Sequence, residues 1–115
     1  MSNADTRAAL VLALQKLPDL SVTPSQPPTI VAGSAWPAWE STRWVNACLT
    51  DSQWFVFVYP PNGDAQSLVD AADQLGDDVA TVLWPEGKVT RMEPWAIPVE
   101  PGQQAVPVLR FTMEI

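Results

Sequence analysis

The chain lacks the residues that most catalytic and metal sites need. Its 115 residues include no histidine, one cysteine (Cys48) and no glycine-rich phosphate loop. Without histidine, neither a Ser–His–Asp triad nor a zinc site with histidine ligands can form. Cys48 has no histidine to activate it and no second cysteine for an internal disulfide. We therefore expect no enzyme activity and no cofactor, and we expect Cys48 to be a small buried side chain.

Basic residues are also scarce. Six lysines and arginines stand against thirteen aspartates and glutamates, for a formal charge of −7. Nucleic-acid-binding proteins and peripheral membrane proteins use lysine and arginine to meet phosphate, so neither class is expected. No apolar stretch approaches the roughly 20 residues of a membrane-spanning helix, and no signal-peptide pattern is present. The sequence predicts a soluble, intracellular protein.

The composition is that of a folded protein, with 47% apolar and 17% charged residues. Its length favours a single domain over residues 1–115. The twelve prolines stiffen connections, and the six tryptophans are large anchors for cores or interfaces.

Periodicity divides the N-terminal half into a helix, an extended arm and strands. Leucines recur at helical spacing over residues 5–17, where Asn3 or Asp5 can cap the start. A proline-rich arm at 18–28 is expected to run along this subunit or a neighbour. Residues 29–32 form a short strand candidate, and 34–39 are expected to be an ordered loop. Strands are predicted at 44–49 and 53–59 around a turn at 50–52, the second of them central because both its faces are apolar.

The C-terminal half predicts one long helix and two strands. Asp64 is expected to cap a helix that ends near residue 83, and Gly76 within it marks close packing or a bend. Strands are predicted at 88–93 and 106–114, with a long, stiff interface loop at 94–104. The predicted buried stripe of the helix consists of Leu68, Ala72, Leu75, Val79 and Val82.

These elements predict an α+β fold. It consists of a small mixed or antiparallel sheet of four to five strands, one long helix packed on it and a short N-terminal helix.

The tryptophans are the first candidate site residues. Trp36, Trp39, Trp84 and Trp95 are expected in loops or at element ends. They could anchor a protein–protein interface, fold back as lids over the core, or stack on sugars in a carbohydrate-binding module. The predicted subunit-interface set is Trp36, Trp39, Trp95 and Ile97.

Acidic residues are the second candidate. Asp70, Asp73 and Asp77 form a strip on the predicted helix. A regular helix spreads such carboxylates along its axis, so a solvated, lumen-facing or inter-subunit face is favoured over a metal site. The carboxylate pairs Glu93–Glu100 and Glu40–Asp51 could serve a glycosidase, but any acidic domain offers such pairs.

The order of elements resembles the tail terminator (tail-completion) proteins of long-tailed bacteriophages. The matching stretches are the leading helix at 7–17, the strand at 54–59, the turn Pro60-Asn62-Gly63-Asp64 into the main helix, and the terminal strand at 108–115. Together they cover nearly the whole chain.

This resemblance implies a structural virion protein. Such proteins form a hexameric ring that ends tail-tube polymerisation and joins tail to head, while DNA passes through the lumen as non-specific cargo. The implied partners are other copies of the chain, the tail-tube protein and a head-completion or connector protein. The implied location is the tail or neck of the virion, after assembly in the host cytoplasm. Another ring-forming neck or head-closure protein is the alternative, and a carbohydrate- or ligand-binding module is a further one.

Overall fold

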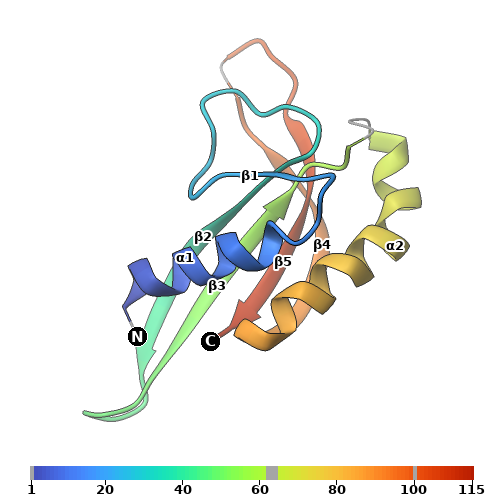
Figure 1. The fold of residues 1–115 in the computed structure, drawn as a ribbon. Coiled ribbons are helices and arrows are strands. Elements are labelled where there is room, and N and C mark those ends of the chain that lie inside the picture. Colours follow the sequence, from blue (N-terminus) through green and yellow to red (C-terminus); the bar gives the residue numbers. More distant parts are fainter. Residues whose placement is uncertain (1, 62–64, 100) are drawn as a thin grey trace.

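The fold is α+β, with a five-stranded mixed sheet and helices on one of its faces (Figure 1). The computed structural model describes residues 2–61, 65–99 and 101–115. The strand order is β1-β2-β3-β5-β4, in which β1 runs parallel to β2 and the other neighbours are antiparallel. The elements are α1 (Asn3–Leu14), β1 (Ser21–Val22), β2 (Ser34–Trp44), β3 (Thr50–Val58), α2 (Ala65–Leu83), the 3-10 turn η1 (Trp84–Glu86), β4 (Lys88–Ile97) and β5 (Val106–Glu114).

The first helix begins with a capping box. The Ser2 hydroxyl accepts a hydrogen bond from the Asp5 backbone N–H at 3.1 Å, and the Asp5 carboxylate accepts one from the Ser2 N–H. Predicting Asn3 or Asp5 as the cap was therefore wrong, because Asp5 is the third residue of the box. The helix ends at Leu14 instead of residue 17. Its last turn is closed by 3-10-type hydrogen bonds, in which the N–H groups of Lys16 and Leu17 donate to carbonyls three residues earlier.

The segment at 18–28, predicted as an extended arm, runs along the sheet of this same chain and contributes a strand to it. Ser21 pairs with Ser34 and Val22 with Ala35, which makes β1 a short parallel edge strand. The strand candidate at 29–32 was wrong, since those residues form no strand. Gly33 (φ +88°) turns the chain into β2, in a conformation that favours glycine.

The β2–β3 hairpin begins earlier in the sequence than predicted, and its turn lies about five residues before the predicted turn. Residues 34–39, predicted as a loop, begin β2, and residues 45–49, predicted as strand, form the turn. The predicted turn residues 50–52 begin β3, which lies at the centre of the sheet as expected.

Pro37 explains why the sequence of β2 did not look like a strand. The carbonyl of Ala35 accepts a hydrogen bond from Thr23 of the β1 segment, on the outer side of β2. Backbone groups alternate along a strand, so residue 37 also faces outward, where β1 has already ended. The N–H that proline lacks would thus face an unpaired edge, which is the place where strands tolerate proline.

The second hairpin is longer than predicted. β5 occupies the predicted residues, whereas β4 continues past residue 93 to Ile97. The predicted interface loop at 94–104 therefore begins only after Ile97. Pro94 did not end the strand, because β4 is the other edge of the sheet.

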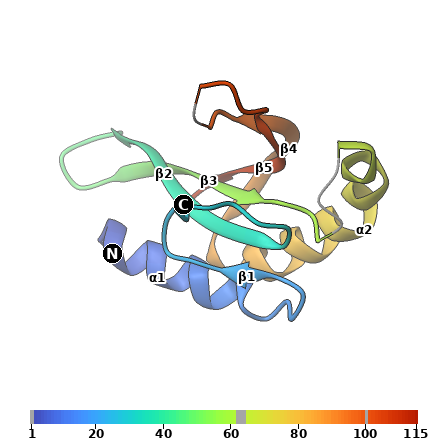
Figure 2. The same cartoon turned by 90° about the horizontal axis from the view of Figure 1, so that it is seen from above.

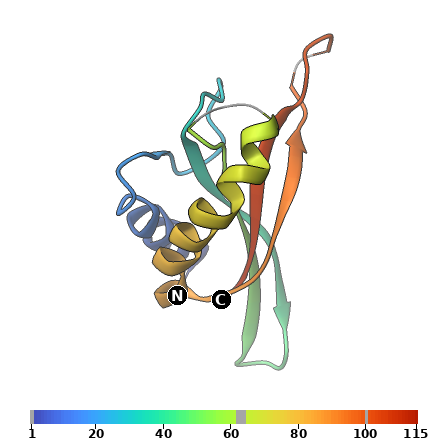
Figure 3. The same cartoon turned by 90° about the vertical axis from the view of Figure 1, so that its right-hand side faces the viewer.

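Both helices cover the same face of the sheet (Figure 3). The predicted stripe of α2 is confirmed, with Leu68 and Val79 buried and the other three members packed against the core. The predicted cap Asp64 lies outside the described residues. The largest fully buried side chains of this main core are Leu10, Leu14, Val56, Val58, Val79, Leu83, Phe111 and Met113.

A second cluster lies on the face without helices. It is formed by Trp36, Phe57, Ile97 and Val108. Viewed from above, α1 lies on one side of the sheet, opposite to the face that carries this cluster (Figure 2). The sheet thus carries apolar side chains on both faces, and this second cluster has no helix above it.

Candidate interaction surfaces

The predicted interface residues divide into two buried and two exposed side chains. Trp36 and Ile97 are 2% and 6% exposed within the second cluster, where Trp36 stacks on Phe57 with 5.4 Å between ring centroids. Trp39 and Trp95 are 53% and 43% exposed. In this structure Trp36 and Ile97 belong to the core of the chain, so the interface prediction now depends on Trp39 and Trp95.

The predicted loop positions were wrong for three of the four tryptophans. Trp36 and Trp39 lie in β2, and Trp95 lies in β4. Trp84 begins η1 at the end of the main helix, as expected, and is 63% exposed.

Trp95 covers an arginine on the helix-free face. The guanidinium carbon of Arg110 lies 3.6 Å from the centroid of the Trp95 ring and 4.4 Å from that of Phe55. The strand registers place Trp36, Phe57, Arg110 and Glu93 in one row across four strands. This row joins an aromatic pair to an ion pair, and its arginine lies between two rings.

Glu93 is held as a carboxylate by Arg110. The guanidinium donates to Glu93 Oε1 from Nε at 3.2 Å and also from Nη2. These hydrogen bonds, with the charges of Arg110 and Arg91, lower the pKa of Glu93 against the opposing effect of burial. A glycosidase acid needs a raised pKa, so Glu93 is poorly suited to that role. The partner considered for it, Glu100, lies outside the described residues.

The second carboxylate pair considered from the sequence has local partners instead. Asp51 forms an ion pair with Arg43 at 3.1 Å, and Glu40 accepts a hydrogen bond from the Ser41 hydroxyl. Both carboxylates are exposed and lie on the outer parts of β2 and β3.

The acidic strip predicted on the main helix is exposed. Asp70, Asp73 and Asp77 all face solvent, and α2 contains no lysine or arginine. Their spacing places them on one side of the helix. Across the described residues, no three histidine, cysteine, aspartate or glutamate side chains are grouped to hold a metal. The strip is therefore a negative surface, with Val69, 75% exposed, beside it.

Gly76 allows β4 to approach the main helix. A Cβ atom at this position would lie 2.6 Å from the sulfur of Met92. Of the two predictions for this glycine, close packing is confirmed. A shallow groove of about 380 Å³ runs beside this contact, between Asp73 and Asp77 on the helix and Val89 on β4.

The hairpin tip, residues 43–51, is the surface that sequence reasoning missed. It projects beyond the body of the molecule (Figure 1, Figure 3). The pairing of β3 with the C-terminal strand and Ile115 extends to Ser52, so beyond that residue the tip is a two-stranded ribbon. Trp44, Val45 and Leu49 are 70%, 51% and 53% exposed. An isolated two-stranded hairpin is marginally stable in water, which makes an apolar tip of this kind a candidate contact surface.

Cys48 lies at this tip and is exposed, so predicting it as a buried side chain was wrong. Its backbone N–H donates to the Asn46 side chain at 2.8 Å. An asparagine that accepts from the residue two positions later is typical of a turn. Asn46 thus indicated the turn, but the apolar residues on either side of it led to the prediction of a strand.

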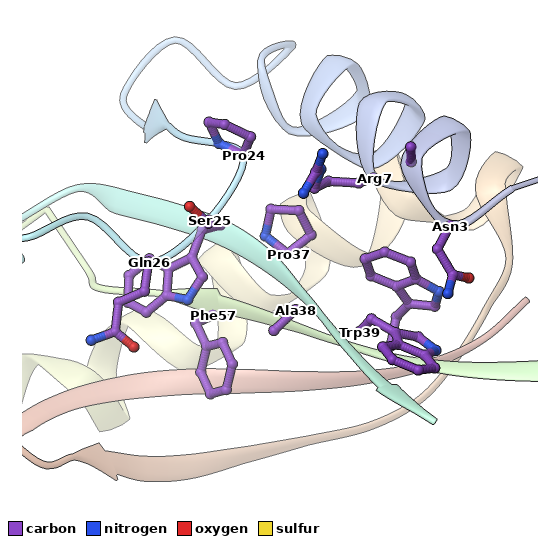
Figure 4. Close-up of a pocket in the computed structure, with 12 residues that line it drawn as sticks. Asn3, Arg7, Pro24, Ser25, Gln26, Pro37, Ala38, Trp39 and Phe57 are labelled. Atoms are coloured by element: carbon purple, nitrogen blue, oxygen red, sulfur yellow. The ribbon is translucent and has the colours of Figure 1, made fainter. Parts of the chain in front are cut away.

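A second surface, the edge groove, follows the outer edge of β2 beyond β1. It has a volume of about 390 Å³ and lies between the start of α1, the segment after β1, and β2 itself (Figure 4). Arg7 is the one charged side chain among its twelve lining residues. The groove is lined by Asn3, Ala4, Arg7, Pro24, Ser25, Gln26, Trp36, Pro37, Ala38, Trp39, Trp54 and Phe57.

Trp54, which is one of the residues that line the edge groove, has a buried hydrogen-bond donor. Trp54 is 2% exposed, and its indole N–H has no hydrogen-bond partner among the described residues. Trp39, its cross-strand neighbour, donates to the Thr42 hydroxyl instead. A buried N–H without a partner is energetically unfavourable, so this indole N–H lowers the stability of the core beside the groove.

Comparison with known proteins adds no family to this geometry. No protein-family model matches the chain, and the search of curated proteins finds no match. Within the described part of the chain, neither helix is both long and apolar enough to span a bilayer.

Proposed function

We propose that this chain is a structural assembly protein that acts as a ring of copies, as its resemblance to tail terminators implies. The observation that carries the proposal is the hairpin tip, which projects from the body of the molecule (Figure 1) and carries three large apolar side chains that are each more than half exposed. A protein that acts by contact needs such a surface. The open edge of β2 provides a second one.

In this role the ring would end tail-tube growth and join tail to head in the virion. Its partners would be further copies of the chain, the tail-tube protein and a head-completion or connector protein. A different ring of the phage neck would need the same kinds of surface, and it remains the alternative within this class.

The charge distribution supports a DNA conduit better than a DNA-binding protein. Lumen walls that let DNA pass should repel phosphate. The α2 strip of Asp70, Asp73 and Asp77 offers such a wall, because it is exposed and no basic residue interrupts the helix.

The test is a tube-capping assay. Tail-tube protein from the same genome is polymerised with and without this protein, and the tubes are examined by negative-stain electron microscopy. Shorter tubes with a ring at one end would support the terminator role. Tubes of unchanged length without end density would contradict it, and rings that bind only the head connector would favour the neck alternative.

A ligand-binding module is the second candidate, and the edge groove favours it. Its volume of about 390 Å³ is near the lower end of ordinary ligand sites, which are roughly 300–1,000 Å³. Trp39 offers a half-exposed ring for sugar stacking, and the polar side chains of Asn3, Arg7 and Gln26 line the same groove. Tryptophan fluorescence titrated with a broad glycan panel tests this function, with Trp39→Ala as control. No change with any glycan would exclude it.

A further inference from the structure

The two helices lie on opposite flanks of the molecule. α1 packs on β2, whereas α2 packs on β4 and β5, and the strand order places β2 and β4 on either side of the central pair (Figure 1, Figure 2). The outward side of α1 and the groove between α2 and β4 would therefore face each other if two copies lay side by side in the same orientation. A ring needs two complementary surfaces placed in this way.

The groove between α2 and β4, called the α2 groove, combines apolar walls with two unpaired carboxylates. Its volume is about 380 Å³, and its apolar lining includes Val89 and the 40% exposed Met92. Asp73 and Asp77 are its two charged lining residues, and both are exposed. Neither carboxylate forms an ion pair or a hydrogen bond with a described residue. An occupant with apolar side chains and a cation would match this lining.

The outward side of α1, called the α1 patch, carries apolar side chains around one cation. Ala8, Val11 and Leu12 line it together with Arg7, and their spacing places them on one side of the helix. Leu12 is 66% exposed. Arg7 is the one charged residue among those that line the patch, and its guanidinium has no partner in the described part of the chain. Arg7 also lines the edge groove, which places it on the β2 flank.

Charge favours the α1 patch as the occupant of the α2 groove. α2 has four aspartates and no basic residue, so it repels most of the surface of a second copy, whose formal charge is −7. Arg43, Arg91 and Arg110 already have carboxylate partners within the chain, whereas Arg7 has none among the described residues.

The shape of the α1 patch also suits a groove. Amphipathic helices bind apolar grooves through residues at positions i, i+3 and i+4, which is the spacing of Ala8, Val11 and Leu12. The patch therefore offers the apolar side chains and the unpaired cation that the α2 groove lacks.

We propose that the α1 patch of one copy docks in the α2 groove of the next copy, with Arg7 next to Asp73 and Asp77. Each copy would give its patch to one neighbour and receive a patch from the other, and such contacts close into a ring when the rotation between copies permits. The inference rests on the proposed function and specifies which surfaces form the ring. Asp70 does not line the groove, so it stays available for a lumen wall.

Charge reversal tests this contact. Arg7→Glu places a third carboxylate against the two of the groove, and we expect the concentration needed for assembly to rise about tenfold or more. Lys16→Glu is the matched control, because it lowers the formal charge by the same amount at an exposed residue that does not line the patch. Native mass over a concentration series measures assembly, and urea denaturation confirms that both variants fold.

A second reversal should restore assembly. In the double variant Arg7→Glu/Asp77→Arg the ion pair is rebuilt with its charges exchanged, and the formal charge returns to −7. The double variant Arg7→Glu/Asp19→Arg has the same formal charge, but its new guanidinium lies outside the α2 groove. We expect the first double variant to assemble like the unmodified chain and the second to assemble as poorly as Arg7→Glu.

Recovery with Asp77→Arg but not with Asp19→Arg would establish the contact. Equal assembly of Arg7→Glu and Lys16→Glu, or equal recovery in the two double variants, would overturn it. The native mass of the unmodified chain separates the two levels of proposal. A closed ring that does not respond to Arg7→Glu refutes this contact alone. Open oligomers that show the specific recovery support the contact and count against the ring, and a chain that stays monomeric throughout contradicts both.

Discussion

At the scale of single residues, Arg110 connects more of the helix-free face than any other charged side chain described. It lies between the rings of Trp95 and Phe55 and donates to Glu93 across the β4–β5 pair. Its side chain is only 14% exposed, so solvent screens these contacts less than those of a surface arginine. We therefore assign Arg110 a structural role that holds β4 against the centre of the sheet.

Replacing this arginine should destabilise the fold. Arg110→Ala removes two ring contacts and the hydrogen bonds to Glu93, and we expect a loss of about 1–3 kcal/mol in the free energy of unfolding. Arg91→Ala is the matched control, because its side chain is 68% exposed and its distance to Glu93 is 4.0 Å. Urea denaturation measures both variants. Equal urea midpoints for the two variants would show that Arg110 contributes no more to the free energy of unfolding than the exposed Arg91.

Glu93 should make part of the stability pH-dependent. Its pKa is lowered in the folded state, so the contribution is complete above the ordinary value of 4.5 and is lost as pH falls through the lowered folded pKa. Asp5 acts in the same direction, because the Ser2 hydroxyl and N–H lower its pKa. The free energy of unfolding of Glu93→Gln, measured from neutral pH downward, should decline less in acid than that of the unmodified chain. An identical decline would contradict a lowered pKa of Glu93.

At the scale of elements, the sequence predicted helices and strands best where buried apolar residues recur at a regular spacing. The stripe from Leu68 to Val82 located the main helix, and the apolar run of β5 gave that strand its bounds. The prediction failed where a proline lies in a strand at an unpaired edge. Prolines normally indicate loops, yet Pro37 lies in the part of β2 that β1 does not cover, and Pro94 lies in the edge strand β4.

The site residues follow a similar division. Exposure of the acidic strip followed from the position of the predicted stripe on the same helix. The positions of Trp36 and Trp39 could not be predicted in this way, since they depend on placing the β2–β3 turn correctly. An error of a few residues there moved Cys48 from a strand to an exposed turn.

The packing of α2 on β4 should respond to Gly76. Gly76→Ala gains about 1 kcal/mol of helix propensity, but the new methyl group meets the sulfur of Met92. We expect the full gain in a Met92→Ala background and a smaller gain, or none, in the unmodified chain. Thermal unfolding of the four proteins forms a double-mutant cycle. An equal effect of Gly76→Ala in both backgrounds would exclude a contact at this point.

At the scale of the whole molecule, the chain has a strongly negative charge, an open sheet edge and an apolar tip. Like-charged copies repel one another, so assembly requires contacts that outweigh a charge of −7 on each copy. The apolar tip is one place where such a contact can gain free energy, because three large apolar side chains within six residues of the chain are each more than half exposed there.

A tip variant should separate assembly from folding. Trp44→Ser replaces a side chain that is 70% exposed, so we expect the monomer to change by no more than about 0.5 kcal/mol while assembly is lost. Trp84→Ser is the control, because Trp84 is similarly exposed but lies on η1, away from the tip. Urea denaturation and native mass are measured on both. A Trp44→Ser protein that assembles normally would remove the tip from the account.

The central claim is that the chain works as a closed ring of copies. The most direct test is native mass over a concentration series, by light scattering or mass spectrometry, with and without tail-tube protein. We predict one discrete oligomer that does not grow further with concentration, with six copies as the resemblance implies. A monomer at every concentration, unchanged when tail tubes are present, would contradict the claim.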